Sequence, residues 1–357
     1  MEKDNLVVSY KFSPWRTWIV KKFFPDLSKN FSKIENILNL AEKTKLTLLV
    51  WSTTLEDEKI EITHPNLTVL RLEDGFIRSV GLGAALIPPF SLVADKRGIY
   101  FDSLRPSDLE VILQETLFDS TLIERARHIL TLLKKYKITK YNLNGTSWIP
   151  KGRIWDKKIL LVPGQVEGDK SIQYGSPLIK TNLELLQIVR EKNPFEYIVY
   201  KPHPDVKAGF RKGYYSEKLI LKIADEIIWE NVDNHELLQS IDEVHTICSL
   251  IGFEALFLGK EVFCYGQPFY SGWSLTKDLL PNPRRRRKLT LEELIVGCII
   301  LYPMYINPFK NQTITPEEVI EELWQLKNNP SFKFLLYKNF SNILSPFIKI
   351  KNWWRGI

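Results

Sequence analysis

Residues 159–204 read ILLVPGQVEGDKSIQYGSPLIKTNLELLQIVREKNPFEYIVYKPHP. The apolar runs at 159–162 and 197–200 predict two buried strands, and the apolar spacing at 182–192 predicts a helix between them. Strand, long loop, helix and strand in this order are typical of a βαβ unit with parallel strands. Because ligands in such sheets bind beyond the carboxyl ends of the strands, the loops after the two strands are candidate site segments.

The same alternation of strands and helices extends along most of the 357 residues. N-terminal to the quoted stretch, the patterns predict strands at 46–51, 67–72, 91–94 and 99–101 and helices at 34–43, 106–117 and 118–136. C-terminal to it, they predict strands at 227–229, 243–247 and 262–265 and helices at 252–259 and 290–301. We therefore expect an α/β fold with doubly wound, mostly parallel sheets.

Chain length and a polar connector at 137–158 predict two domains, because one hydrophobic core rarely serves so long a chain. We expect a Rossmann-like domain at 1–150, a second at 151–330, and a tail at 331–357. The last 18 residues, FSNILSPFIKIKNWWRGI, mix cations with a Trp pair, which suits the surface of an anionic membrane. Packing of this tail back onto the first domain is the alternative.

Composition narrows the class of protein without choosing a function. Hydrophobic residues make up 44% and charged residues 25%, as in ordinary globular proteins. The net charge of +7 and the pI of about 9.0 favour an anionic partner: nucleic acid, anionic lipid or a phosphorylated substrate. The three cysteines are widely spaced, which predicts buried, reduced thiols rather than disulfides or a zinc site. Without a signal-peptide pattern or a membrane-spanning apolar stretch, we expect a cytoplasmic protein.

The segment RLEDGFIRSVGLG (71–83) places two acids at the exit of the strand predicted at 67–72. An acid at a strand exit can act as a general acid or base, and an arginine can hold a carboxylate with two hydrogen bonds. Glu73 and Asp74 are the candidate acids, and Arg71 and Arg78 are the candidate arginines. A helix N-cap with a surface ion pair is an equally good interpretation.

The loop GQVEGDKS (164–171) follows the first strand of the second half. Its glycines let the backbone approach a ligand, and one of its two carboxylates, Glu167 or Asp169, can attack a sugar carbon as a nucleophile. Taken alone, a turn built from Asp and Gly is the better interpretation of this loop.

The tetrapeptide KPHP follows the strand at 197–200. Two prolines restrict the loop, so that the His203 imidazole is held rigidly beside Lys201. This pair suits the binding of a phosphate and the neutralisation of a leaving group. A lone histidine is more often structural. No second His or Cys stands at metal-ligand spacing, so we expect no metal.

The segment TICSLIGFEAL (246–256) predicts a strand, a turn of small residues and a helix. A helix N-terminus offers amides to a phosphate, with Ser249 and Gly252 beside it, and Glu254 can accept hydrogen bonds from ribose hydroxyls. The loop YGQPFYSGW (265–273) suggests an exposed, sugar-facing surface, with a packed loop as the alternative. The run Arg284 to Arg287 is typical of a solvated face.

Together these segments resemble the retaining β-Kdo transferases of bacterial capsule assembly, which take the acidic eight-carbon keto-sugar Kdo from its CMP-activated form. The resemblance runs from about residue 67 to 325 in the order of that family. The stretches that carry it are RLEDGFIRSVGLG, SLVADKRGIYFDSLRPSDLE, LLVPGQVEGDKSI, VYKPHPDVKAGFRKG, VHTICSLIGFEALFLGK, YGQPFYSGWSLTKD, RRRRKLTLEEL and LYPMYINP. It implies a GT-B-like fold with two Rossmann-like domains facing a cleft, acceptor contacts in the first and nucleotide contacts in the second.

The resemblance also implies roles for single residues. Asp169 is the expected nucleophile of a double displacement, Glu73 the acid or base, and Asp74 its reserve. The donor is expected to contact Gln165, Lys201, His203, Ser249, Gly252 and Glu254, and Arg78 is expected to bind the Kdo carboxylate. CMP-Kdo is the donor substrate, and neither a metal nor another cofactor is implied.

The function implied is transfer of Kdo to a Kdo-terminated glycolipid based on (lyso)phosphatidylglycerol, at the inner face of the inner membrane. Expected partners are CMP-Kdo, this lipid acceptor, an anionic membrane surface and other capsule assembly proteins. The alternative is a non-catalytic scaffold that binds nucleotide or lipid. Nucleic acid is not expected, because no nucleic-acid-binding motif accompanies the positive charge.

Two departures from the family pattern stand out. Enzymes of that family often carry two such modules in tandem, whereas this sequence contains one. Its segments VHTICSL and SPWRTWIVKKFFP are more similar to the second module. The other departure is Gly168, a position where the family pattern leads us to expect an acid.

Overall fold

The computed structural model of the chain describes residues 5–55, 60, 63–152, 156–207, 211–332 and 334–338. The described residues form two compact units. Unit 1 draws on Met1–Ile99, Lys140–Leu143 and Cys298–Ile357, and unit 2 on Tyr100–Thr139 and Asn144–Gly297. The chain thus passes between units after residues 99, 139, 143 and 297, and not once near residue 150 as the sequence predicted. The expected membrane-surface segment at 340–357 lies outside the described residues.

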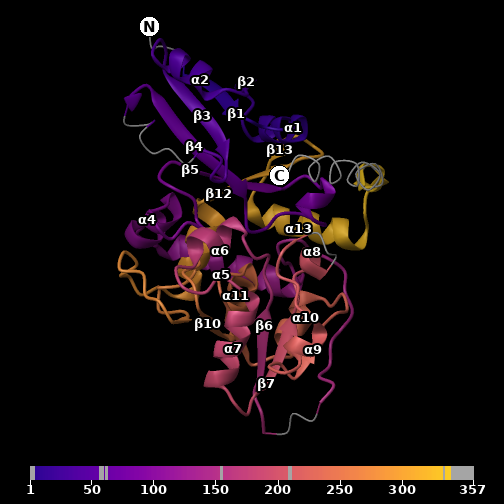
Figure 1. Ribbon diagram of the computed structural model, residues 1–357. Helices are drawn as coiled ribbons and strands as arrows, with labels where there is room; N and C mark the ends of the chain where they lie inside the picture. The colour runs from indigo at the N-terminus through magenta and orange to yellow at the C-terminus, as the bar shows by residue number, and fades with distance from the viewer. Residues whose placement is uncertain are drawn as a thin grey trace. The chain divides into compact units, whose positions relative to one another are not determined.

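Unit 1 contains a mixed sheet with the strand order β13-β12-β5-β4-β3-β1-β2. Its strands are β1 (Leu6–Tyr10), β2 (Leu27–Phe31), β3 (Leu46–Trp51), β4 (Leu67–Asp74), β5 (Ser91–Asp95), β12 (Pro303–Asn307) and β13 (Gln312–Thr313). The strands β2, β1, β3 and β4 are parallel to their neighbours in this group. The pairs β4/β5, β5/β12 and β12/β13 are antiparallel. Figure 1 labels these elements.

Helices α1 (Pro14–Phe23) and α2 (Ile34–Ala41) cover opposite faces of the unit 1 sheet, because successive side chains of β3 point to opposite sides. Leu48 packs in one apolar cluster with Ile37 of α2. Leu49 packs in another with Val20 of α1. Two further elements complete the unit: the short 3₁₀ turn η1 (Gly83–Ala85) and helix α13 (Pro316–Asn328), which packs against β12.

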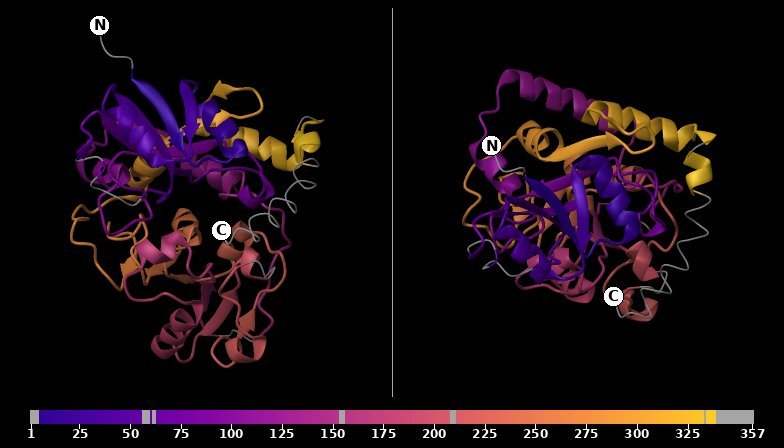
Figure 2. Two further views of the ribbon diagram at one scale, coloured as in Figure 1. Left: turned by 45° about the horizontal axis from the view of Figure 1, so that its top comes forward. Right: turned by 90° about the horizontal axis from the view of Figure 1, so that it is seen from above.

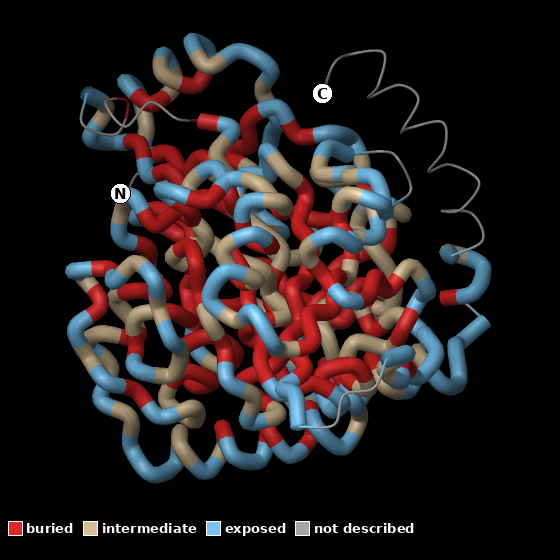
Figure 3. Tube along the Cα trace, turned by 60° about the horizontal axis from the view of Figure 1, so that its bottom comes forward, coloured by how far each residue is buried: buried red, intermediate tan, exposed pale blue. Residues whose placement is uncertain are grey.

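Unit 2 contains a parallel sheet with the strand order β11-β10-β9-β6-β7-β8. Its strands are β6 (Ile159–Pro163), β7 (Tyr197–Lys201), β8 (Glu226–Ile227), β9 (Glu243–Thr246), β10 (Glu261–Cys264) and β11 (Lys277–Asp278). Its helices are α4 (Asp108–Glu115), α5 (Ser120–Lys135), α6 (Lys170–Gly175), α7 (Asn182–Lys192), α8 (Pro204–Lys207), α9 (Glu217–Ile220), α10 (Asn234–Gln239), α11 (Leu250–Phe257) and α12 (Leu291–Ile295). The strands β6 and β7 are buried along most of their length, and Figure 3 marks the buried residues of the chain in red.

Two long-range contacts explain why the unit boundaries differ from the predicted ones. β12 pairs with β5, with Met304 opposite Leu92, which adds the C-terminal strands to the unit 1 sheet (Figure 2). Conversely, α12 packs against α5, so that the segment from residue 100 to 139 belongs to unit 2. Such pairings join segments that lie far apart in the chain, and local patterns do not encode them.

The α/β fold with two mostly parallel sheets confirms the predicted fold class. The predicted strand at 99–101 is wrong: the chain turns there, because the Asp95 carboxylate accepts hydrogen bonds from the Arg97 and Gly98 amides. The predicted helix at 290–301 is α12 followed by a π-helical turn, η2 (Val296–Leu301). β1, β2, α1, β12, β13 and α13 were not expected from the sequence.

Candidate active site

In unit 1, the acids predicted at the exit of β4 form a cluster with side chains from two other segments. We call Arg16, Trp51, Glu73, Asp74 and Arg78 the acid cluster. Glu73 is half-buried, and its Oε1 accepts a hydrogen bond of 3.1 Å from the Asp74 amide. Burial, reinforced by the negative charge of Asp74, raises the pKa of Glu73 to about 7. A carboxyl group with this pKa can give up or take a proton at neutral pH.

Arg78 is engaged within the acid cluster. Its Nε donates to Asp74 Oδ2 at 2.6 Å, and its NH1 donates to Ser79 Oγ at 2.7 Å. The residue is only 2% exposed, and its guanidinium fills the space beside Gly83. The structure therefore shows Arg78 as a partner that orients Asp74, while its expected contact with a Kdo carboxylate stays a prediction.

In unit 2, the predicted nucleophile Asp169 is exposed and forms the N-cap of α6. Its Oδ1 accepts hydrogen bonds from the amide and the hydroxyl of Ser171, at 2.9 and 2.8 Å. The preceding Gly168 has φ +83°, a backbone conformation that favours glycine, and this explains why no acid stands there. The turn interpretation is thus correct for the backbone, and the carboxylate remains accessible at the exit of β6.

Gln165, expected to contact the donor, is buried and joins three segments of unit 2. Its backbone exchanges two hydrogen bonds of 2.8 Å with the Asn182 side chain. Its side-chain Oε1 accepts from the Cys248 amide at 3.0 Å, and its Nε2 donates to Cys248 Sγ at 3.3 Å. Gln165 therefore fixes the loop after β6 to the loop after β9, which carries Ser249.

The KPHP loop leaves β7 with both of its polar side chains half-buried. Burial lowers the pKa of Lys201, against the opposing charge of Glu254. Burial also lowers the pKa of His203, although Asp205 and Asp169 act in the opposite direction. We call Asp169, Lys201, His203 and Glu254 the Lys-His cluster.

The tautomer of His203 follows from one hydrogen bond. His203 Nδ1 accepts from the Asp205 amide at 3.2 Å, so a neutral imidazole carries its proton on Nε2. Asp169 is close enough for its charge to influence the pKa of His203. The structure thus brings these two predicted site residues together within unit 2, and leaves Nε2–H as a hydrogen-bond donor.

Ser249 caps α11, with its Oγ accepting from the Ile251 amide at 3.3 Å. Gly252 has a packing reason that the sequence did not reveal. A Cβ there would lie 2.3 Å from Tyr270 Oη, which donates to the Ser249 carbonyl at 2.5 Å. Gly252 therefore makes room for a tyrosine that holds the turn before α11, and its expected contact with the donor is untested.

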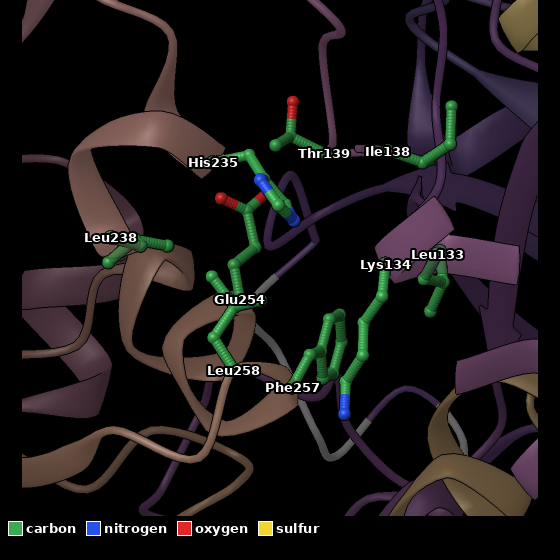
Figure 4. Close-up of a pocket in the computed structure, with 9 residues that line it drawn as sticks. All are labelled: Leu133, Lys134, Ile138, Thr139, His235, Leu238, Glu254, Phe257 and Leu258. Carbon is green, nitrogen blue, oxygen red and sulfur yellow. The ribbon is translucent and has the colours of Figure 1, made fainter. Parts of the chain in front are cut away.

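Glu254 points into a small pocket of unit 2 (Figure 4). In this view its carboxylate lies beside the His235 ring of α10, while the amine of Lys134 points away from it. The pocket is lined by Leu133, Lys134, Ile138, Thr139, His235, Leu238, Glu254, Phe257 and Leu258. Glu254 also influences the pKa of Lys201, so its carboxylate lies near the KPHP loop as well as in the pocket. This position is compatible with the expected contact to ribose.

The aromatic loop at 265–273 is not an exposed sugar-facing surface. Tyr270 and Trp273 are both 0% exposed, and Phe269 packs edge-on against Tyr270. Trp273 Nε1 donates to the Phe269 carbonyl at 2.9 Å. The expectation of exposure was wrong because these rings build the core behind α11, as the alternative of a packed loop proposed.

The arginine run at 284–287 is likewise not a solvated face. Arg284 and Arg285 direct their Nε groups at the two carboxylate oxygens of Glu110, at 2.6 and 3.1 Å. Arg287 donates to the Thr116 carbonyl at 2.7 Å, and only Arg286 of the four is exposed. The side chains of three of the four arginines therefore contact other segments of unit 2.

The cysteines are free thiols, with Cys264 and Cys298 buried as expected and Cys248 half-buried. Burial raises the pKa of Cys248 to about 11, so its thiol is a poor nucleophile at neutral pH. Among the described residues, no group of three His, Cys, Asp or Glu side chains could hold a metal ion. No helix in the described part of the chain is long and apolar enough to cross a membrane.

Sequence reasoning missed Arg16 and Trp51, which complete the acid cluster. Arg16 lies in the first turn of α1, after the N-cap Ser13 and Pro14. Its guanidinium carbon lies 4.4 Å from the centroid of the Trp51 ring at the end of β3. The Ser-Pro pair signals a helix start, and could have placed Arg16 at the carboxyl edge of the sheet. Asn182 and Tyr270 gave no such signal.

Comparison with known proteins gives a consistent result. Residues 48–307 match the family described as capsule polysaccharide biosynthesis protein. The capsule polysaccharide modification protein LipA of Neisseria meningitidis serogroup B is 46% identical over 320 residues, which cover 88% of this chain and 45% of LipA. The lipopolysaccharide-processing protein LpsZ of Rhizobium meliloti is 37% identical over 92% of this chain and 76% of LpsZ. The chain therefore spans about half the length of LipA.

Two solved structures are similar over almost their whole length. The β-Kdo 2,7 transferase of Thermosulfurimonas dismutans KpsC gives a TM-score of 0.78 at 46% identity, covering 90% of this chain and 99% of that structure. The β-Kdo 2,4 transferase of the same KpsC gives a TM-score of 0.77 at 33% identity, covering 90% and 98%. The two likenesses are nearly equal in fold and differ in sequence.

Proposed function

Because this chain belongs to the family of capsule polysaccharide biosynthesis proteins, we propose that it transfers Kdo from CMP-Kdo to a Kdo-terminated glycolipid, with retention of configuration. The observation that carries the proposal is the raised pKa of Glu73, about 7, at the exit of β4. A sugar transferase needs a group that takes the proton of the acceptor hydroxyl, and Glu73 is the acid that burial prepares for that task. The similarity to KpsC supports the choice of Kdo as the sugar.

We assign the first chemical step to unit 2. The Asp169 carboxylate attacks C2 of Kdo, a C–O bond to the enzyme forms, and CMP leaves with the electron pair of the broken bond. Lys201 and the Nε2–H of His203 offset the charge that develops on the departing phosphate. Support comes from the electrostatic influence of Asp169 on His203, which places carboxylate and imidazole near each other.

The second step uses unit 1. The acceptor hydroxyl attacks C2, the bond to Asp169 breaks, and the hydroxyl proton passes to Glu73. Two inversions at C2 give net retention. For this step Glu73 must be ionised, and Arg16 and Lys140 both favour its ionised form.

We further propose a β2,7 linkage for the product. The two KpsC transferases are equally close in fold, so the fold cannot discriminate between linkages. Sequence identity does differ, at 46% to the 2,7 transferase and 33% to the 2,4 transferase. Digestion of the product and identification of the substituted Kdo oxygen by NMR tests this choice.

A lipid acceptor requires contact with a membrane surface, so we propose peripheral binding at the cytoplasmic face of the inner membrane, alongside other capsule assembly proteins. The basic, Trp-containing segment at 340–357 is the proposed contact and lies outside the described residues. Sedimentation with phosphatidylglycerol vesicles tests this part. We expect binding that high salt releases, and no binding to neutral vesicles.

The assay that tests the function combines the purified chain, CMP-Kdo and a synthetic Kdo-terminated lipid, and follows release of CMP together with the mass of the lipid. We expect the lipid to gain one Kdo. Binding of CMP-Kdo without release of CMP would instead support the alternative of a non-catalytic scaffold. The Asp169→Asn variant is the matched control, because asparagine keeps the helix cap while losing the nucleophile.

A further inference from the structure

The Nε atom of Arg16 lacks, among the described residues, the hydrogen bond that three other arginines form through the same atom. In Arg78, Arg190 and Arg285 this nitrogen donates to an oxygen at 2.6, 2.7 and 3.1 Å. Arg16 Nε is buried, yet it has no hydrogen-bond partner among the residues that the structure describes. A buried donor without a partner is unfavourable, and in a native protein it calls for a ligand or water to complete it.

One contact fixes the backbone of Arg16 and another supports its guanidinium. Ser13 Oγ accepts from the Arg16 amide at 3.2 Å and fixes the first turn of α1. The guanidinium of Arg16 lies over the face of the Trp51 ring, with 4.4 Å between the ring centroid and the guanidinium carbon. Thr53 lies two positions after Trp51, and its Oγ1 is also buried without a partner in the described structure. A stacked, preorganised guanidinium and an unused hydroxyl thus occur together at the carboxyl end of β3.

The charges around Arg16 leave room for an anion. Burial lowers the pKa of Arg16, and the charges of Glu73 and Asp74 act in the opposite direction. Asp74, however, is already paired with Arg78 at 2.6 Å. Glu73, with its pKa of about 7, carries only part of a negative charge at neutral pH. Lys140 adds a further positive charge near Glu73. An arriving carboxylate therefore meets the guanidinium of Arg16, whose Nε has no partner among the described residues.

We infer that Arg16, stacked on Trp51, is the subsite for the carboxylate of the acceptor's terminal acidic sugar. A planar guanidinium binds a planar carboxylate with two parallel hydrogen bonds, which lysine cannot do. Arg16 lies in the same cluster as Glu73, the group that takes the proton of the acceptor hydroxyl. The carboxylate contact orients the sugar so that its hydroxyl faces Glu73. This inference rests on the proposed transferase function and adds to it the group that selects an acidic acceptor.

The test uses the full chain and two soluble acceptors, one ending in Kdo and one ending in Kdo whose carboxylate has been reduced to an alcohol. For Arg16→Gln we expect the KM for the Kdo acceptor to rise about 10- to 100-fold, the effect of losing a charge-assisted pair of hydrogen bonds. The KM for CMP-Kdo should stay within twofold. With the reduced acceptor, variant and wild type should have the same KM.

Two controls separate this contact from folding. Lys21→Gln removes a positive charge from an exposed position of the same helix and should change neither KM. Arg16→Lys keeps the charge without the planar fork and should raise the KM for the Kdo acceptor by a smaller factor. If Arg16→Gln does not fold, as judged from its circular dichroism, the acceptor KM of Arg16→Lys alone tests the inference.

A change in the KM for CMP-Kdo in place of the acceptor would assign Arg16 to the donor sugar and overturn the inference. An unchanged acceptor KM in Arg16→Lys would also overturn it. Binding of the Kdo acceptor by calorimetry, with no donor present, gives a second readout. Loss of that binding in Arg16→Gln supports the subsite even if wild type transfers no Kdo, so failure of the subsite and failure of the proposed function are distinguishable.

Discussion

The acid cluster of unit 1 and the Lys-His cluster of unit 2 both lie where parallel strands end, and burial acts on them with opposite consequences. In the acid cluster, burial raises the pKa of Glu73 to about 7. In the Lys-His cluster, burial is the largest cause that lowers the pKa of Lys201 and of His203. Burial thus favours the uncharged form in both clusters, which means a higher pKa for the acid and lower pKa values for the two bases.

The difference suggests a division of labour. A carboxyl group that titrates near neutral pH suits proton transfer, whereas cations with lowered pKa values suit short contacts to a phosphate that restores their charge. Asp169 differs from these buried groups, because it is exposed and its side chain caps helix α6. An exposed carboxylate at the exit of a strand is accessible to a bound sugar, as a nucleophile must be.

The largest expected effect is that of Asp169→Asn. We expect transfer to fall about 10⁴-fold or more, because no other group replaces the nucleophile. Asparagine caps a helix as well as aspartate does, so the melting temperature should stay unchanged. Asp169→Ala should lose activity equally and also about 1 kcal/mol of stability. Rates of CMP release with thermal unfolding of both variants check this, and an active Asp169→Asn would reject the nucleophile.

Glu73→Gln tests the proton-transfer role of the acid cluster. We expect kcat to fall about 10²- to 10⁴-fold, the usual contribution of a general base. In wild type the base must be ionised, so the rate should rise with pH through about 7, and Glu73→Gln should lose this limb. Initial rates from pH 5.5 to 8.5 provide the measurement. A rise near pH 7 that survives in the variant would move the role to another group.

His203→Ala tests the phosphate contact of the Lys-His cluster. Removing one preorganised donor should lower kcat by about 10²-fold. His203→Gln is the matched variant, because its amide can still donate a hydrogen bond and should recover part of the rate. Full activity of His203→Ala would show that Lys201 alone holds the phosphate. Steady-state rates of CMP release distinguish these outcomes.

The smallest effect on activity is expected at a third charged group, at the opposite end of the unit 2 sheet. Glu243 Oε2 lies 3.1 Å from His245 Nε2, and Lys158 contacts its other oxygen, at the start of β9. The His245 hydrogen bond is the largest cause that lowers the pKa of Glu243 to about 2.

Because the folded pKa of Glu243 is depressed, its contribution to stability is present above about pH 4.5 and is lost as pH falls toward 2. Glu243→Gln should lower the melting temperature at pH 7 by about 2–8 °C and flatten its acid dependence. The kcat should stay within twofold. A large loss of kcat would show that charged groups at both edges of the unit 2 sheet support the reaction. It would contradict the assignment of the reaction to the acid cluster and the Lys-His cluster.

Local patterns in the sequence predicted much of the fold. The strand at 46–51 and the helix at 182–192 match β3 and α7 residue for residue, because apolar periodicity and capping are local properties. The site acids were found because Glu73 stands at the carboxyl end of β4 and Asp169 in the loop after β6. Strand exits are readable from sequence, and they are also where ligands bind.

Contacts between distant segments could not be predicted. Arg284 and Glu110 are 174 positions apart, so the arginine run resembled a solvated face until its carboxylate partner was known. The burial of Tyr270 against Gly252 and the stacking of Arg16 on Trp51 have the same cause. Composition gave the charge of these side chains, and only the fold shows which charges are already paired.

The central claim, that a carboxylate of unit 2 attacks the sugar, is tested most directly by trapping the intermediate. The chain is incubated with CMP-Kdo in the absence of acceptor, and the protein is digested and mapped by mass spectrometry. We predict a single added Kdo on Asp169, in the loop that follows β6. A Kdo adduct on Glu73 or Asp74, in unit 1, would contradict the account.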